Sequence, residues 1–577
     1  MYLSQVFFDV FVICPTSGLF ETQTALFNNT QYLSITYTKI AMIFDINPET
    51  KMQLSDNIVR HCRFAVSAKA SAVLRYFSQP FLRDDLIVDW SKGITYFSGF
   101  ATKNFDTTER KANQELTEII TILPKWLFSA HTKCDEIHTI RLDRDASGQY
   151  STTCKPLSTS DYFAQLRALH LASGQTHQAS QSDAAQSFEG GLAGFIGYDL
   201  AAQQHVAAQS VEPSDSERLI AAIGDYDIFL KKEAEGWALY GSDDPCLAPL
   251  IAQIISVFKN FESVLTITSA NAQLITETNL GSSTPTNPFR VKKPFKPSWS
   301  FDEYAAAFQR IQDYLRAGDC YQVNLTQPFI ATVEGDLLDV MDDLFALTRA
   351  PYSGYMCVGQ HELLSCSPEL FLAFSGEDEQ GNNQVITRPI KGTRPRSDNT
   401  VQDKTERDAL IHSEKDHSEN LMIVDLLRND LSLHAVVGSV TVPALFELES
   451  FAQVHHLVSE IRATLSADVS PLDVLIDALP GGSITGAPKK RAMEIIAELE
   501  AAPRGAYCGS FGFLNRDGSG QFNVLIRTLQ KHQDQLIAWA GGGITIASEV
   551  EAEYQECLDK ISAILNCVNG FKPPQDH

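Results

Sequence analysis

The pattern of apolar and polar positions is clearest in the second half of the chain. Ser300 and Glu303 form a capping box, after which apolar residues recur at helical spacing until Gly318. Residues 321–327 then alternate between apolar and polar side chains, which predicts a strand with one polar face. Further strands come in hairpin-like runs, and long helices are predicted over 402–430, 488–500 and 549–567. This order favours an α+β fold with mainly antiparallel sheets.

The same pattern divides the chain into four segments. Residues 1–60 show no periodicity and form an N-terminal extension of unknown role. Residues 61–285 contain short apolar runs between polar loops, including the glycine-rich strand "EGGLAGFIGYDL". Residues 286–299 are rich in proline and small polar residues, which predicts a linker. Residues 300–570 carry the strongest patterns and form the candidate functional domain.

Composition excludes several classes of function. The chain has 46 basic and 71 acidic residues, a net charge of -25 at pH 7, so it repels nucleic acid and anionic membranes. Its 11 cysteines are scattered singly, which argues against a disulfide framework or a zinc ribbon and favours a reducing compartment. No segment is a convincing signal peptide or membrane span. We therefore expect a cytoplasmic protein with no nucleic-acid or membrane partner.

Acidic side chains gather on two predicted helices. On the last helix, which Ser548 and Glu551 are expected to cap, Glu549, Glu553, Glu556 and Lys560 share one face. On the helix over 402–430, one side carries His412, Asp416 and Glu419. Glutamates from two helices can supply oxygen ligands to one Mg²⁺ ion, although a solvated acidic face has the same pattern.

Several single residues point to an anionic ligand. Arg527 is the one charge in a mostly apolar predicted strand, "FNVLIRTL", and Tyr507 is expected nearby. A buried arginine needs an acidic partner or a substrate carboxylate. The run "AWAGGGIT" has three glycines, as if a ligand lies against the backbone, and at least one of His455 and His456 should face inward. A glycine loop before Pro488 offers amides for an anion but lacks the lysine of a P-loop.

Taken together, these motifs resemble the chorismate-utilising enzymes. The resemblance covers about residues 300–568 through "SPEL", "PIKGTRPR", "SENLMIVDLLRNDL", "VHHLVS", "PGGSITGAPKKRAMEII", "GAYCGSFGF", "IRT" and "AGGGI". It is weaker in the N-terminal half, where "EGGLAGFIGYDL" carries it. It implies the chorismate-binding, anthranilate synthase-like fold, in which mainly antiparallel sheets pack face to face and helices flank them.

The resemblance assigns roles to individual residues. It implies that Glu419 and Glu556, with Glu553 nearby, hold Mg²⁺ on the ring carboxylate of chorismate. The other carboxylate would be bound by Tyr507, Arg527 and the strand at Gly541 and Gly543. Further positions beside the substrate match Ser483, His456 and Lys560.

Lys391 distinguishes branches of this family. The resemblance implies alanine at this position in anthranilate synthases and lysine in the branch that makes 4-amino-4-deoxychorismate. It implies that Lys391 attacks C2 of the ring while Glu369 protonates the departing C4 hydroxyl, before ammonia adds at C4. Nearby arginines, Arg388, Arg394 and Arg396, are expected to disfavour the ammonium form of the lysine.

Two further features of the sequence concern the nucleophile and the source of ammonia. Family members that add water have lysine at the position of Gln322, so water is disfavoured as the nucleophile here. The chain has no glutamine amidotransferase nucleophile motif, and the resemblance implies a separate subunit of that class as the source of ammonia. Two alternatives remain: an anthranilate synthase with an atypical lysine, and a non-catalytic chorismate-binding module.

Overall fold

The computed structural model describes residues 53–572, and these belong to one compact unit, Met52–His577. It leaves out residues 56–57, 65–67, 79–91, 99–117, 134–135, 147–148, 174–186, 207–216, 271–287, 379–380, 398, 451–453 and 501. The predicted extension over 1–60 lies mostly outside the described residues. Its last residues are not an extension, because the first two strands of a sheet begin at Gln53 and Ile58.

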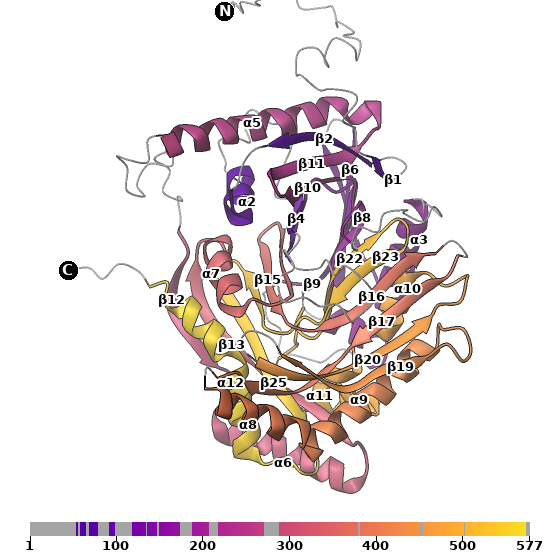
Figure 1. The fold of residues 1–577 in the computed structure, drawn as a ribbon, viewed down its shortest axis with the longest axis vertical. Helices are drawn as coiled ribbons and strands as arrows, with labels where there is room; N and C mark the ends of the chain where they lie inside the picture. The colour runs from indigo at the N-terminus through magenta and orange to yellow at the C-terminus, as the bar shows by residue number, and fades with distance from the viewer. Residues whose placement is uncertain are drawn as a thin grey trace, which may run out of the picture. The chain divides into compact units, whose positions relative to one another are not determined.

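Antiparallel pairing builds a first sheet from both halves of the chain (Figure 1). Its strand order is β1 (Gln53–Ser55), β2 (Ile58–Phe64), β11 (Gly236–Ser242), β10 (Ile228–Glu233), β4 (Glu118–Thr121), β3 (Lys92–Ser98), β14 (Tyr352–Val358), β15 (His361–Ser367), β24 (Thr528–His532), β25 (Gln535–Ile544), β13 (Gln322–Glu334) and β12 (Arg290–Pro297), and the short β21 (Gly486–Ala487) pairs with β13. The two halves of the chain meet where β3 pairs with β14.

A second antiparallel sheet is mixed in the same way. Its order is β18 (Ile390–Pro395), β20 (Val454–Thr464), β17 (Asn383–Arg388), β16 (Leu370–Glu377), β23 (Ser519–Asn523), β22 (Ser510–Asn515), β8 (Gly191–Ile196), β9 (Arg218–Tyr226), β5 (Trp126–Lys133), β6 (Glu136–Arg144) and β7 (Tyr150–Pro156), with β19 (Thr441–Ser450) beside β20. Here the halves meet at β8 and β22, where Gly191 pairs with Asn515.

The two sheets pack face to face through an aromatic core. Phe97 of the first sheet stacks on Phe511 of the second, with ring centroids 4.9 Å apart, and lies edge-on to Phe513 at 5.5 Å. All three side chains are buried. Buried aromatic pairs of this kind contribute beyond their buried area, so they fix the spacing of the sheets. The predicted α+β class and face-to-face sheets are confirmed.

Helices cover the outer faces of the sheets, and their ends test the sequence predictions. The helix α6 (Phe301–Ala317) begins at the predicted Ser300–Glu303 capping box and ends at Gly318, which has a positive φ of 80°. The predicted helix over 402–430 is wrong as one element, because it breaks at His412 into α8 (Thr400–Ile411) and α9 (Glu414–Ser432). Ser413 caps the second part, so His412 does not share the face of Glu419.

The remaining predicted helices are present with shifted ends. The helix α11 (Lys489–Leu499) follows Pro488, and α12 (Val550–Asn569) follows Glu549. The predicted cap at Ser548 is wrong, since its hydroxyl donates to Glu553 Oε1 at 2.7 Å and accepts from the Thr545 N–H, and it accepts no hydrogen bond from an N–H group of the helix. Other helices are α2 (Ala70–Ser78), α3 (Thr159–Ala172), α4 (Tyr198–Ala202), α5 (Ala248–Ala270), α7 (Leu338–Thr348) and α10 (Pro471–Ala478), with short 3₁₀ turns η4 (Pro245–Leu247) and η5 (Gly482–Ile484). Figure 1 shows α5 running along β2.

The predicted linker over 286–299 is also wrong in its centre. Residues 290–297 form β12, an edge strand that pairs with β13. Its two prolines suit an edge, where one side of the backbone needs no partner. Each sheet contains strands from before and after this segment, so the predicted boundary at 285–300 does not divide the chain into two separate sheets.

The predicted strand over 321–327 is present as the start of β13, and its residues 322–326 are buried on both faces. Another strand prediction is wrong. The run "FNVLIRTL" is not one strand: β23 ends at Asn523, β24 begins at Thr528, and Arg527 lies between them with φ 53°. The Arg527 guanidinium is therefore positioned by the short connection between β23 and β24, and not by a strand as expected.

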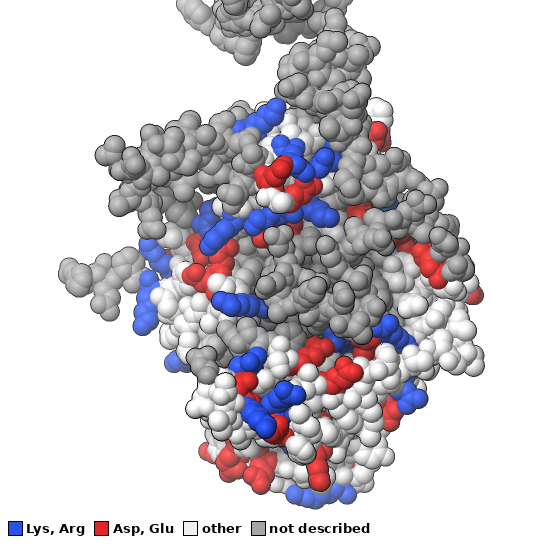
Figure 2. All heavy atoms as spheres, viewed as in Figure 1, with Lys and Arg blue, Asp and Glu red and all other residues white. Residues whose placement is uncertain are grey.

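The surface fits the acidic composition. On the face drawn in Figure 2, basic and acidic side chains lie intermixed. Surface ion pairs such as those of Arg63 with Glu233 and Glu235 also join opposite charges. In the described part of the chain, no helix has the length and apolar character needed to cross a membrane.

Candidate active site

All the residues predicted for the site line one cavity of about 470 Å³. The first sheet contributes Gly541 and Gly543, the second contributes Lys391 and His456, and α9 and α12 contribute carboxylates. The members are Glu369, Lys391, Glu419, His456, Ser483, Tyr507, Arg527, Gly541, Gly543, Glu553, Glu556 and Lys560. A cavity of this size accommodates a small organic ligand.

Glu369 and Lys391 form an acid and an amine on the same wall. Glu369 is buried just before β16, and Lys391 lies on β18 with its Nζ 3.5 Å from Ser483 O. Burial raises the pKa of Glu369 to about 7, an effect that Lys391, the Ile390 amide and the Ser483 hydroxyl only partly offset. A carboxyl group with this pKa can donate a proton near neutral pH.

The arginines around Lys391 are ion-paired, contrary to expectation. Arg388 pairs with Glu449 and also lies 3.1 Å from Glu460. In the same way, Arg394 pairs with Asp416 at 3.5 Å and Arg396 with Asp403 at 2.8 Å. Each of the three arginines therefore has an acidic partner of its own, which the sequence did not predict.

Three glutamates, Glu419, Glu553 and Glu556, line the same cavity from α9 and α12. Glu553 is buried and is bound by Lys415 Nζ at 3.2 Å, while Glu556 pairs with Lys560 at 2.8 Å. Burial raises the pKa of Glu419, although Lys391 and Lys415 act against it. Burial opposes ionisation of Glu556 too, but Lys560 holds the pKa of Glu556 below its usual range.

These carboxylates fit an open cation site and not a closed cage. Within the described ranges, one group of three ligating side chains has its atoms within 4.8 Å of one another, and it lies elsewhere. Glu419, Glu553 and Glu556 do not form such a group, so a cation bound by one or two of them would take its other ligands from water and substrate.

Arg527 and Tyr507 both line this cavity. Arg527 forms no ion pair with any acidic residue that the structure describes, its side chain is half-buried, and burial lowers its pKa. A guanidinium withdrawn in part from water needs a compensating partner, which a ligand anion can supply. The Tyr507 ring is buried and stacks on Trp539 with centroids 5.8 Å apart, which fixes its orientation.

The triple-glycine strand lies directly against this space. A Cβ at Gly541 would lie 2.0 Å from Leu325 O, and one at Gly543 would lie 2.1 Å from Gln322 Nε2. A Cβ at Gly542 would instead point toward Glu553 and Lys560, at 3.3 and 3.4 Å. Side chains here would displace β13 or enter the cavity, so glycine keeps the backbone close to a ligand.

His456 and Gln322 are both buried, and they differ in their hydrogen bonds. His456 Nδ1 lies 2.9 Å from Thr393 Oγ1, and burial lowers its pKa to about 4, so the ring is neutral. Its neighbour His455 is held by Ser450 and Asp403 and does not line the cavity. Gln322 is buried beside Gly543, and its side chain makes no hydrogen bond within the described part of the chain.

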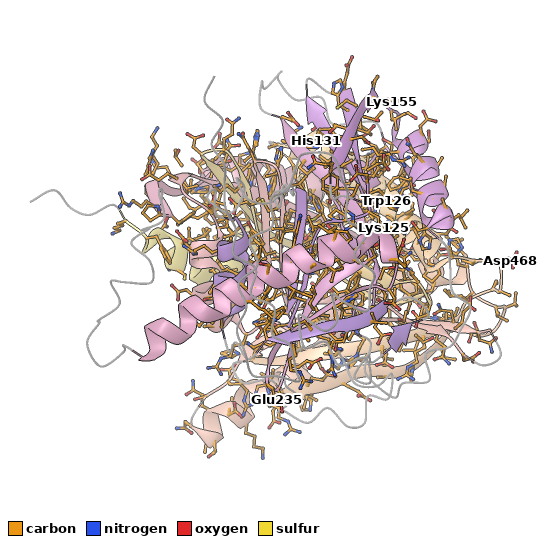
Figure 3. All side chains as sticks on the ribbon, turned by 90° about the horizontal axis from the view of Figure 1, so that it is seen from above. Lys125, Trp126, His131, Lys155, Glu235 and Asp468 are labelled. Atoms are coloured by element: carbon orange, nitrogen blue, oxygen red, sulfur yellow. The ribbon has the colours of Figure 1, made fainter. Side chains whose placement is uncertain are left out.

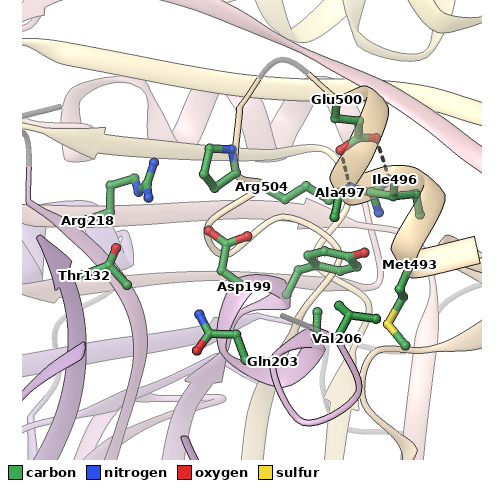
Figure 4. Close-up of a pocket in the computed structure, with 13 residues that line it drawn as sticks. Thr132, Asp199, Gln203, Val206, Arg218, Met493, Ile496, Ala497, Glu500 and Arg504 are labelled. Carbon is green, nitrogen blue, oxygen red and sulfur yellow. Dashed lines mark hydrogen bonds and ion pairs between the residues drawn. The ribbon is translucent and has the colours of Figure 1, made fainter. Parts of the chain in front are cut away.

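A buried ion pair supports the back of the site. Arg504 binds Glu500 and donates to the carbonyls of Ile484 and Asn324, two residues that line the cavity, at 2.9 and 2.8 Å. Glu500 also accepts from the Thr326 hydroxyl at 2.7 Å. Figure 4 shows this pair beside a separate small cavity of about 50 Å³ that Asp199 and Arg218 also line.

Sequence reasoning missed Lys415. Its side chain lines the cavity and pairs with Glu553. It stands four residues before Glu419 on α9, a spacing that places both on one helix face, so the pattern was available. Asn324 and Trp539 were also missed, because a lone buried polar or aromatic residue in a strand carries no distinctive spacing.

A buried acid beside a lysine, an unpaired guanidinium and a carboxylate cluster define an enzyme-type site for an anionic small molecule. Comparison with known proteins identifies the class further. Residues 125–566 match the family model described as chorismate binding enzyme, and the chain belongs to this family.

Named relatives and a solved structure agree with this assignment. Aminodeoxychorismate synthase component 1 from Salmonella typhimurium is 41% identical over 390 residues, which is 67% of this chain and 78% of that protein. Anthranilate synthase component 1 from Thermus thermophilus is 39% identical over 274 residues, 48% of this chain and 58% of that protein. The crystal structure of anthranilate synthase component I from Streptococcus pneumoniae has a TM-score of 0.60 at 23% identity, covering 80% of this chain and 95% of that one.

Proposed function

We propose that this chain aminates chorismate at C4, as an aminodeoxychorismate synthase component I, and so supplies para-aminobenzoate synthesis. The observation that carries the proposal is that Lys391 lines the same cavity as a buried Glu369 whose pKa is raised to about 7. Alignment supports it, since the Salmonella typhimurium relative matches 67% of this chain and the Thermus thermophilus anthranilate synthase 48%.

In the proposed reaction, Lys391 acts as a neutral amine. Its Nζ forms a bond to ring carbon C2, the ring double bond shifts, and the C4–oxygen bond breaks. Glu369 gives its proton to the departing hydroxyl, which leaves as water. Ammonia then adds at C4, the double bond shifts back, and the C2–Nζ bond breaks. The new ammonium group returns a proton to Glu369, so both residues are regenerated.

The other residues of the cavity position the substrate in this proposal. Arg527 and Tyr507 bind the enolpyruvyl carboxylate beside the glycine strand. Ser483 and His456 contact the ring and orient it against Lys391. Because His456 is neutral, it offers hydrogen bonding without adding charge beside the lysine.

Mg²⁺ is the cation that we propose for the carboxylate cluster. Glu419 and Glu556 would hold it, with Glu553 behind them, and the ion would neutralise the ring carboxylate of chorismate. Lys560 donates to Gly541 O at 3.0 Å and so ties the metal-binding helix to the glycine strand. Ammonia is proposed to come from a separate glutamine amidotransferase subunit.

The product assay tests this function. Purified chain, chorismate, Mg²⁺ and an ammonium salt, followed by an aminodeoxychorismate lyase, are expected to give para-aminobenzoate. Anthranilate as the sole product would instead establish the alternative function, and binding of chorismate without turnover would show a non-catalytic module. Omitting the lyase is the control, since the amino product then accumulates.

The protonation state of Glu369 predicts the pH dependence of the ammonia reaction. The acid must be protonated, and its pKa is about 7, so the turnover rate should fall as pH rises through that value. Glu369→Gln should lower the rate by roughly 10²–10⁴-fold and remove this descending limb. The measurement is a pH profile of kcat at a fixed concentration of free ammonia. A profile with the same descending limb in Glu369→Gln would assign the ionisation to another group.

The cation site predicts a metal requirement. Glu556→Gln should raise the Mg²⁺ concentration for half-maximal activity by at least about ten-fold, because it replaces a charged ligand by a neutral amide. Asp559→Asn is the matched control: this carboxylate also lines the cavity on α12 but is not proposed as a ligand. Equal Mg²⁺ dependence in both variants would contradict the assignment of Glu556.

A further inference from the structure

A second group of ligating side chains lies outside the chorismate site. His131, Glu217 and His361 each offer a nitrogen or oxygen atom, and these atoms all lie within 4.8 Å of one another. None of the three lines the active-site cavity. His131 and Glu217 belong to the second sheet and its approach, whereas His361 begins β15 in the first sheet.

Strand pairing brings the group together. His131 pairs with Leu219 across β5 and β9, which places Glu217 at the entrance to β9 beside it. His361 pairs with His532 across β15 and β24. His131, labelled in Figure 3, lies near the C-terminal end of β5, which begins at Trp126. The three ligand side chains therefore come from segments far apart in sequence. Two of them belong to the second sheet and its approach, and the third belongs to the first sheet.

The environment of each ring is that of a metal ligand. His131 is buried, its Nε2 lies 3.0 Å from Ser129 Oγ, and its Nδ1 lies 2.7 Å from Glu217 Oε1. That Nδ1 contact lacks the direction of a hydrogen bond, and within the described residues the atom has no other partner. The His361 ring stacks flat on His532, with centroids 4.1 Å apart, which fixes its orientation. Such supporting contacts orient ligand rings in metal sites.

The group offers two imidazole nitrogens and one carboxylate oxygen to a cation, and one of its members is open to solvent. The Glu217 side chain is 41% exposed, which gives an ion a route in from solvent.

We propose that His131, His361 and Glu217 bind one divalent transition-metal ion between the two sheets. Two imidazoles and a carboxylate are ligands typical of Zn²⁺, with the fourth position taken by water. This site is separate from the Mg²⁺ site, which uses oxygen ligands on α9 and α12. Bound metal connects β5 to β15, so it stabilises the contact between the sheets.

Cobalt titration of the full chain tests the proposal. After dialysis against a chelator, Co²⁺ should bind with one equivalent showing visible absorption bands of low coordination number, and Zn²⁺ should displace it and raise Tm. His361→Ala and Glu217→Gln should each weaken this binding by at least about 100-fold, since even supporting residues of metal sites contribute 10–100-fold. Glu217→Gln preserves the size of a half-exposed side chain, so this variant should fold. It therefore still tests the site if His361→Ala does not fold.

Two further variants separate this site from other binding. His412→Ala removes an exposed histidine at the end of α8 and should leave the cobalt bands unchanged. Glu556→Gln disables the proposed Mg²⁺ site and should also leave them unchanged. The proposal is overturned if the wild type shows no bands, or if the bands persist in both His361→Ala and Glu217→Gln.

Discussion

Replacing Lys391 by alanine is expected to abolish formation of the 4-amino product, lowering its rate by at least roughly 10³-fold, as loss of a covalent nucleophile does in other enzymes. The cavity remains, because Lys391 makes one long contact, 3.5 Å to Ser483 O. Chorismate should therefore still bind. The measurement combines product analysis with calorimetric titration of chorismate, so that loss of chemistry is distinguished from loss of binding.

A covalent adduct gives a second readout for this lysine. Wild-type protein incubated with chorismate without ammonia should show a mass increase located on the peptide that contains Lys391. Lys490→Ala, an exposed lysine on α11, is the control and should keep both the adduct and the product. If Lys391→Ala forms the para-amino product at the wild-type rate, the lysine is not the nucleophile.

The second large effect is on stability. Arg504→Met should lower the free energy of unfolding by about 3–5 kcal/mol, because it leaves the buried carboxylate of Glu500 without its partner. It also removes donors to Ile484 O and Asn324 O, so the wall of the cavity loosens. Chemical denaturation monitored by far-ultraviolet circular dichroism measures the change. Arg504→Lys should rescue little, since an ammonium group cannot reproduce the fork of hydrogen bonds.

A neighbouring pair provides the matched control. Arg310 pairs with Glu498 on the surface at 2.9 Å, two residues before Glu500. Arg310→Ala should leave the unfolding midpoint nearly unchanged, because water replaces an exposed ion pair. An equally small effect of Arg504→Met would show that the cavity wall does not depend on the buried pair.

The fold was predictable where local pattern and pairing agree. The capping box at Ser300 predicted the start of α6, and the alternating residues 321–327 predicted the start of β13. Errors came where tertiary contacts decide. The prolines of 290–297 suggested a linker, yet pairing with β13 makes this segment an edge strand. The sequence also did not predict that the polar residues Gln322, Asn324 and Thr326 of β13 are buried.

For the site, residue type predicted more than spacing. Arg527 was recognised as unusual because a charge in an apolar run needs a reason, even though its strand proved to be a turn. Distances between elements could not be predicted, so the pairing of each arginine near Lys391 with its own acid was missed. The histidine–glutamate group left no pattern at all, because its members lie on separate strands.

The pairing of distant strands has a consequence for how this chain is made. During synthesis, β3 and β8 emerge long before their neighbours β14 and β22. Until then each presents an unpaired edge, and β8 is apolar on both faces. Such late, long-range closure slows folding and exposes the growing chain to aggregation, so we expect a strong dependence on chaperones during expression. A fragment of residues 300–570 would expose the opposite edges, β14 and β22, and should aggregate when produced alone.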